Sequence, residues 1–176
     1  MSPNECCACD HIFIPLAFVL VGTNISLYGT LSKPSSRGPP SATFTIDNSA
    51  PEAFNATGSI TVPNYDINTS HILFYQSPVL AQGQHTLTVR TGTSASGPTA
   101  PLYVDFLTIA TGLDNVSGDV IVDDEDPSIT YTGTWKIYDS RVLYMGTSRQ
   151  SPTTAAGGTA TFRFNGMFAP SAGHQY

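Results

Sequence analysis

The main charge cluster of the chain is a run of four acids at residues 123–126. Carboxylate oxygens are ligands of Ca²⁺, which takes about six to eight of them. The spacing of an EF-hand loop fails, because Ile129 stands where that loop needs glycine and Trp135 where it needs glutamate. Alternate residues of an extended chain share a face, so Asp124 and Asp126 could still supply two calcium ligands. The alternative is a solvated turn of acids before a proline.

Aromatic side chains around and beyond this cluster could bind a sugar. A ring can stack on the apolar face of a pyranose while neighbouring hydroxyl groups bond the sugar hydroxyls. Because the single tryptophan, Trp135, shares an expected strand face with Ile129 and Tyr131, core packing is its expected role and sugar stacking the alternative. The candidate ligand-binding residues are Tyr131, Trp135, Tyr138 and Tyr144, with Tyr65 as a further loop aromatic.

Catalytic motifs are missing from the sequence. The nearest approach to G-x-S-x-G begins at Gly92 and lacks the closing glycine, and no H-E-x-x-H occurs. The four histidines are scattered, and His85, at the start of an expected strand, is assigned a surface role. A glycosidase pair could be drawn from Asp47, Asp105 or Asp124, but only distances in space define such a pair. We expect a protein that is not an enzyme.

The three cysteines lie together at Cys6, Cys7 and Cys9. They cannot form a disulfide that links distant segments of the domain, and their odd number leaves at least one thiol unpaired within the chain. Cys6, Cys9 and His11 could begin a zinc site, but the second ligand pair that such a site needs is missing. The core must therefore be held by packing, and no cofactor is expected apart from calcium.

The composition favours β-structure and excludes a nucleic-acid surface. The 176 residues carry 7 Lys+Arg against 13 Asp+Glu, a formal net charge of −6, whereas nucleic-acid binding needs clustered positive charge. Counting along the chain gives 22 Thr and 18 Ser, beside 15 Gly and 13 Pro, a mix typical of short strands and many turns. At this length one domain is expected.

The longest apolar run, residues 12–21, contains Pro15 and is about half as long as the ~20 residues of a transmembrane helix. We therefore expect no membrane span. The run resembles the apolar part of a signal peptide, but Glu5 and Asp10 precede it with no Lys or Arg, so a signal is not supported. Four N-glycosylation sequons count only if the chain enters the secretory route: Asn24, Asn55, Asn68 and Asn115.

Alternating apolar and polar residues between Gly, Pro and Ser predict about ten short strands. Residues 102–109 are apolar on both faces apart from Asp105, as in a central strand. Segments rich in Ser, Gly and Pro are assigned to surface loops: 32–40, 92–101 and 146–158. The expected strand segments are 18–21, 25–28, 42–46, 72–75, 85–89, 102–109, 128–131 and 161–164.

Residues 160–166 are similar in sequence to residues 16–22, as in a weak internal repeat. Both segments are therefore candidates for the same strand position in the fold. Together, residues 122–135 and 158–166 resemble the opening half of a domain common in secreted and membrane-anchored proteins of mushroom-forming fungi, a domain with a galactose-binding-like jelly-roll fold. Its closing half resembles the segments 22–29, 42–47, 74–78, 83–87 and 102–106. The two halves stand in inverted order here.

The resemblance implies an all-β, two-sheet antiparallel jelly-roll sandwich, circularly permuted or cut from a tandem array. If the first and last strands of the family domain are joined, residues 102–109 should pair antiparallel with 119–122 or 129–131. The expected division is an N-terminal extension at 1–16, a closing half at 17–109, a linker at 110–118, an opening half at 119–168 and a tail at 169–176.

The resemblance also implies a secreted or cell-surface location and a non-catalytic binding module, with glycans as the leading partners. One alternative is a ligand-free structural ectodomain of a membrane-anchored protein. Another is a gene-model fragment that folds poorly.

Overall fold

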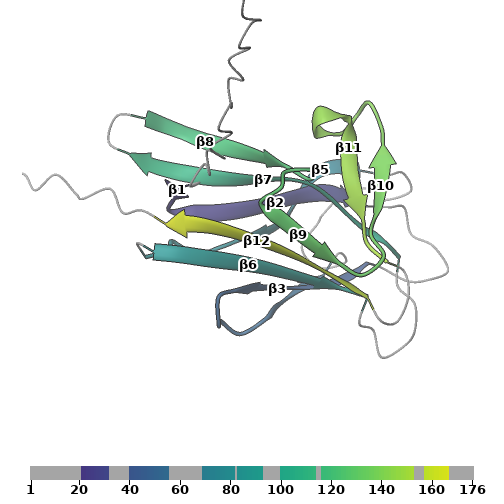
Figure 1. Ribbon diagram of the computed structural model, residues 1–176, viewed down its shortest axis with the longest axis horizontal. Helices are drawn as coiled ribbons and strands as arrows, with labels where there is room; N and C mark the ends of the chain where they lie inside the picture. The colour runs from purple at the N-terminus through teal and green to yellow at the C-terminus, as the bar shows by residue number, and fades with distance from the viewer. Residues whose placement is uncertain are drawn as a thin grey trace, which may run out of the picture.

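The computed structural model describes residues 21–31, 40–55, 69–81, 83–92, 100–113, 116–152 and 157–166 (Figure 1). The cysteines, His11, Tyr65, and the expected extension 1–16 and tail 169–176 lie outside these residues, as do the sequons Asn68 and Asn115. The described chain is nearly all strand, and one short 3₁₀ turn, η1 (Tyr144–Gly146), is its only helical element. This confirms the all-β class predicted from the composition and the alternating pattern.

The strands form two sheets that lie one above the other (Figure 1). Sheet A runs in the order β1 (Val21–Gly22), β12 (Gly158–Gly166), β6 (Gly83–Thr91), β3 (Ser41–Ile46) and β4 (Glu52–Asn55), with β9 (Ile129–Thr132) also paired to β12. Sheet B runs in the order β10 (Lys136–Asp139), β11 (Thr147–Gln150), β7 (Leu102–Leu113), β2 (Asn24–Leu31) and β5 (Thr69–Gln76), with β8 (Val116–Asp123) also paired to β7. All pairings are antiparallel except the parallel contact between β1 and β12.

The inner faces of both sheets follow the predicted alternation. Phe44 and Ile46 of β3 are buried while Thr43 and Thr45 are half-buried. On β12, Phe162 and Phe164 are buried on either side of the exposed Arg163. Apolar side chains that point to one face of each sheet meet between the sheets and exclude water from that space, which is the main source of stability for such a sandwich. Each strand predicted in the described residues is present.

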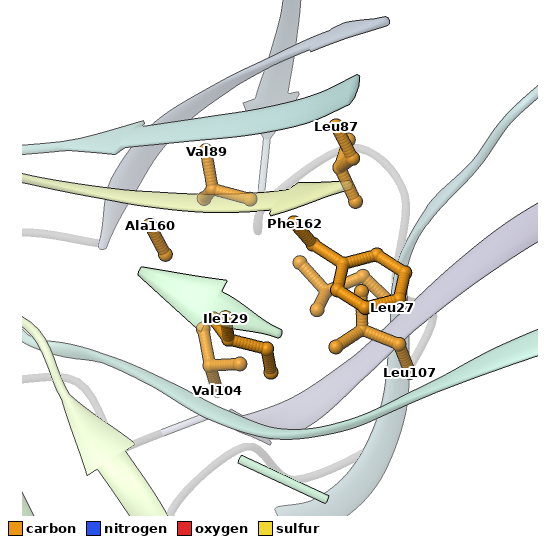
Figure 2. Close-up of a pocket in the computed structure, with 8 residues that line it drawn as sticks. All are labelled: Leu27, Leu87, Val89, Val104, Leu107, Ile129, Ala160 and Phe162. Atoms are coloured by element: carbon orange, nitrogen blue, oxygen red, sulfur yellow. The ribbon is translucent and has the colours of Figure 1, made fainter. Parts of the chain in front are cut away.

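The two sequence halves share this core. Ile129, Ala160 and Phe162 come from the later half, and Figure 2 shows them against five side chains from the earlier half: Leu27, Leu87, Val89, Val104 and Leu107. The gap that they enclose has a volume of only about 10 Å³, about the space of one water molecule. It is therefore a packing gap in an apolar core and is too small for a ligand.

The predicted pairing across the joined ends is confirmed. β7 and β8 run antiparallel from Phe106 opposite Asp123 to Leu113 opposite Val116. The segment 110–118, expected as a linker, thus consists mostly of the two arms of a β-hairpin. Pairing continues through it because extended residues on neighbouring strands satisfy each other's main-chain hydrogen bonds, which a loose linker would leave to water.

The described end of the earlier repeat copy, β1, lies beside the later copy, β12, in sheet A. β12 carries Phe162 and Phe164 into the core, and Val21 of β1 pairs in parallel with Asn165 at the sheet's edge. Residues 18–20 of the earlier copy lie outside the described residues. The later copy therefore holds the central position, and the described part of the earlier copy is a short added edge strand.

Two further expectations are corrected. The segment 146–158, assigned to a surface loop, contains β11, whose Arg149 and Gln150 pair with β7. Trp135, expected on the strand that carries Ile129 and Tyr131, lies beyond it, because β9 ends at Thr132 and Gly133 turns the chain with a φ of 96°. Polar strands such as β11 lack the alternation of apolar and polar residues from which the strands were predicted, so this strand was missed.

Candidate functional site

The four aromatic residues predicted to bind a ligand do not form one platform. Tyr131 and Trp135 contact each other, with ring centroids 5.1 Å apart, and both pack against the core. Tyr138 of β10 lies 5.2 Å from the Tyr103 ring, and Tyr144 of η1 lies 5.2 Å from Phe106. The structure therefore distributes these side chains over three separate aromatic contacts.

Tyr131 and Trp135 also have their polar groups engaged within the protein. The Trp135 indole N–H donates to the Thr132 carbonyl at 3.0 Å, and the Tyr131 hydroxyl donates to the Asp124 carbonyl at 2.9 Å. The guanidinium of Arg149 lies 5.2 Å from the centre of the Tyr131 ring. Burial, followed by the charge of Asp124, raises the pKa of Tyr131. These contacts agree with the core-packing role expected for Trp135.

The two carboxylates expected to hold calcium have separate protein partners. Asp124 is fully buried and accepts a hydrogen bond from Thr147 Oγ1 at 2.8 Å, with Arg149 Nε 3.5 Å from its other oxygen. Asp126 accepts from the main-chain N–H and the hydroxyl of Ser128, which closes a turn as the solvated-turn alternative expects. Within the described ranges no three His, Cys, Asp or Glu side chains are grouped closely enough to hold a metal ion.

Asp105 is the second fully buried acid, and a β-bulge positions it. Tyr28 pairs with Phe106 but Gly29 with Val104, so Asp105 is the extra residue of β7. Its Oδ1 accepts the Tyr144 main-chain N–H at 3.0 Å, and its Oδ2 lies 3.5 Å from His71 Nε2 without a hydrogen-bond partner in the described structure.

Burial raises the pKa of both buried acids to about 6. At Asp105 the Tyr144 N–H and then His71 oppose the increase, and at Asp124 the Thr147 hydroxyl opposes it most strongly. Both groups are nevertheless closed to solvent, since each side chain is 0 % exposed. A glycosidase needs two carboxyl groups that reach the substrate, so neither Asp105 nor Asp124 can form such a pair with Asp47 in this structure.

A larger pocket opens where the edge of sheet A faces β5. Its volume is about 660 Å³, within the range of small-molecule sites. One wall is the turn from Asp47 to Ala50 together with Glu52, and the other is the loop that carries Pro78 and Leu80. We call this the end pocket, and its described lining is Phe44, Ile46, Asp47, Asn48, Ser49, Ala50, Glu52, Tyr75, Pro78 and Leu80.

The floor of the end pocket is aromatic and its rim is polar. Phe44 and Tyr75 stack with ring centroids 5.1 Å apart and an interplanar angle of 21°. Burial, followed by the charge of Glu52, raises the pKa of Tyr75, and both residues line the pocket. The described lining contains two carboxylates and an amide but no Lys or Arg. This arrangement favours a neutral polyhydroxy ligand or a cation over an anion.

Asp47 and His85 hold the pocket wall in place. Asp47 has a φ of 51°, and its Oδ1 accepts the Thr86 N–H at 2.8 Å while its Oδ2 lies 2.8 Å from His85 Nδ1. His85 Nε2 lies 2.9 Å from the Ala81 carbonyl oxygen. His85, for which a surface role was expected, is half-buried with its side chain 11 % exposed, and each ring nitrogen lies within hydrogen-bonding distance of an oxygen acceptor.

Sequence reasoning named Asp47 only as a possible catalytic acid and missed Glu52, Tyr75 and the rest of this pocket. The pocket lining comes from two stretches that are far apart in sequence, 44–52 and 75–80, so periodicity could not group them. Of the sequons, Asn24 is half-buried on β2 beside Ala110, and Asn55 is the last residue of β4.

Among the described residues no helix is long and apolar enough to cross a membrane.

Comparisons with protein-family models, with curated proteins and with solved structures find no match to this chain, so its function has to be argued from the geometry of the end pocket.

Proposed function

We propose that this protein is a non-catalytic carbohydrate-binding module that holds a neutral sugar in the end pocket. The observation that carries the proposal is the pocket itself, about 660 Å³ in volume, with the stacked Phe44 and Tyr75 below and acids and an amide at the rim. Carboxylate and amide oxygens accept hydrogen bonds from sugar hydroxyls, and an apolar floor suits the C–H faces of a pyranose. Glycans are the partner class.

The module is proposed to act without chemistry on its ligand. His85 is not part of the described lining of the end pocket, and its ring nitrogens face Asp47 and the Ala81 carbonyl oxygen rather than a ligand. Asp47, the pocket acid beside it, is bonded at both oxygens. Glu52 is the pocket carboxylate left to bind, and a glycosidase needs a pair.

The two-sheet sandwich supports the resemblance to a jelly-roll domain of the galactose-binding-like kind, in circularly permuted form. The support is the β7–β8 pairing, which joins the expected first and last strands. The resemblance also implies a secreted or cell-surface location, and such a location suits a protein that binds glycans. The rival function is a structural ectodomain without a ligand, and binding experiments separate the two.

Glu52→Gln is expected to weaken sugar binding about tenfold, because a charged acceptor forms a stronger hydrogen bond to a sugar hydroxyl than an amide does. Glu52 is exposed, so the fold should be unaffected. Binding would be measured by calorimetry and by NMR titration with neutral mono- and oligosaccharides chosen from a glycan array.

The matched control is Glu125→Gln, an exposed acid that faces Arg149 rather than the end pocket. It should bind the same sugar as the unmodified chain does. Binding of no neutral sugar, with no shift at the Tyr75 or Glu52 resonances, would favour the structural function. Equal affinities of the two variants would place any sugar elsewhere.

A further inference from the structure

The side chain of His85 joins the two walls of the end pocket. Its Nδ1 lies 2.8 Å from Asp47 Oδ2 in the turn that forms one wall. Its Nε2 lies 2.9 Å from the carbonyl oxygen of Ala81, the residue that follows Leu80 of the other wall. We call His85, Asp47 and Ala81 the His85 clamp.

Both partners of the imidazole are hydrogen-bond acceptors. A carboxylate oxygen and a main-chain carbonyl oxygen have no hydrogen to donate. A neutral imidazole has a single N–H and can make only one of the two bonds, whereas the imidazolium makes both. The geometry of the His85 clamp therefore fits the protonated form of His85.

Among the described residues, Asp47 is the one opposite charge that faces a protonated His85. Asp47 faces it from the turn after β3, the ring of Phe164 from β12 at 5.8 Å, and Gln84 and Thr86 flank it on β6. Arg163 pairs with Thr86 and therefore points to the other face of the sheet. Burial alone lowers the pKa of His85, but its bonds to Asp47 and Ala81 and the charge of Asp47 raise it above 6.5 overall.

Loss of the proton should release one wall selectively. The bond to Asp47 is the stronger because its acceptor is charged, so a neutral His85 keeps its hydrogen on Nδ1. Nε2 then presents a lone pair to the Ala81 carbonyl and that bond is lost. Asp47 stays anchored by the Thr86 N–H, while the loop that carries Leu80 loses a tether.

We propose that protonated His85 fastens the two walls of the end pocket, and that ligand binding weakens when His85 loses its proton. His85 is thus a positioning residue, and the protein would bind most tightly in mildly acidic surroundings. The identity of the ligand in this inference rests on the proposed function, whereas the closure of the walls does not.

The clamp can be tested without a ligand on the unmodified chain of 176 residues. The imidazole resonances of His85 should titrate above pH 6.5, the ordinary pKa of histidine. The protection factor of the Leu80 amide, which donates to the Thr23 carbonyl at 2.8 Å, should fall about fivefold as the pH rises from about 5.5 to about 8.5. Titration at or below 6.5, or constant Leu80 protection, would overturn the inference.

The binding test uses the neutral sugar that shows the highest affinity. Its dissociation constant should rise about fivefold over the same pH range in the unmodified chain, and His85→Gln should abolish this pH dependence. The control is His71→Gln, which removes the other histidine with an acidic neighbour, Asp105, and should keep the full pH dependence. If no sugar binds at any pH, the proposed function fails, while the Leu80 measurement still decides the clamp.

Discussion

Asp105→Asn is expected to stabilise the protein at pH 7 by about 2 kcal/mol. Folding carries the carboxyl of Asp105 into a site where it is 0 % exposed and raises its pKa from 3.8 to about 6. That difference of about 2 pH units corresponds to about 3 kcal/mol against the charged form. Asparagine keeps an oxygen for the Tyr144 N–H and removes the buried charge, and imperfect packing of its amide beside His71 offsets part of the gain.

The gain should depend on pH in a definite direction. A carboxyl whose pKa is raised by folding favours the folded state below its unfolded pKa, and this contribution is lost as the pH rises through the folded value. The difference between Asp105→Asn and the unmodified chain should therefore be small near pH 4, grow between about pH 4 and about pH 6, and stay constant above that. Urea denaturation at a series of pH values measures it.

The control for this series is Asp119→Asn, an exposed acid on β8 of the same sheet. It removes the same charge without changing a buried group, so the stability should change by less than about 0.5 kcal/mol at any pH. Destabilisation of Asp105→Asn at pH 7 would show that the contacts of the carboxylate, with the Tyr144 N–H and His71, outweigh the cost of burial.

Phe162→Ala is expected to destabilise the protein by about 4 kcal/mol, the largest effect that we anticipate for a single core residue. The side chain is 2 % exposed and fills the space between the sheets, next to Leu27 and Leu107 from the earlier half of the sequence (Figure 2). Its loss leaves a cavity that strands paired on both sides cannot close.

The same variant tests whether the two halves unfold together. Trp135 fluorescence reports the later half and amide exchange along β7 reports the earlier half. Both should shift to lower urea concentration by the same amount, because one core serves both. Ile137→Ala, at a side chain that is 50 % exposed on β10, should leave both midpoints almost unchanged. Separate transitions for the two probes would mean that the halves are independent units.

Residues with strong local patterns were predictable without coordinates. The alternation at 42–46 and 161–164 placed Phe44 and Phe162 on the buried face, because a strand's period of two allows only one face for the apolar set. The pairing of 102–109 with 119–122 was one of two alternatives that followed from the resemblance and the inverted order of its halves, and the structure selects it over pairing with 129–131. β11 was missed because its polar residues carry no such pattern.

The functional residues were harder to find for a different physical reason. Burial of Asp105 depends on a bulge between β2 and β7, and a shift of one residue in register has no signature in a single strand. Tyr75 lies on β5 of sheet B and Glu52 on β4 of sheet A. The end pocket therefore exists only after the two sheets have packed together.

The order of apolar and polar residues along the chain was enough to specify strands, their buried faces and a sandwich of two sheets, since these depend on near neighbours and on the exclusion of water. Which side chains meet across the sheets is a separate matter. Register and packing between distant segments determine how far His85 lies from Asp47 and Ala81, and they close Asp105 to solvent. Patterns of neighbouring residues in the sequence do not predict register or packing between distant segments.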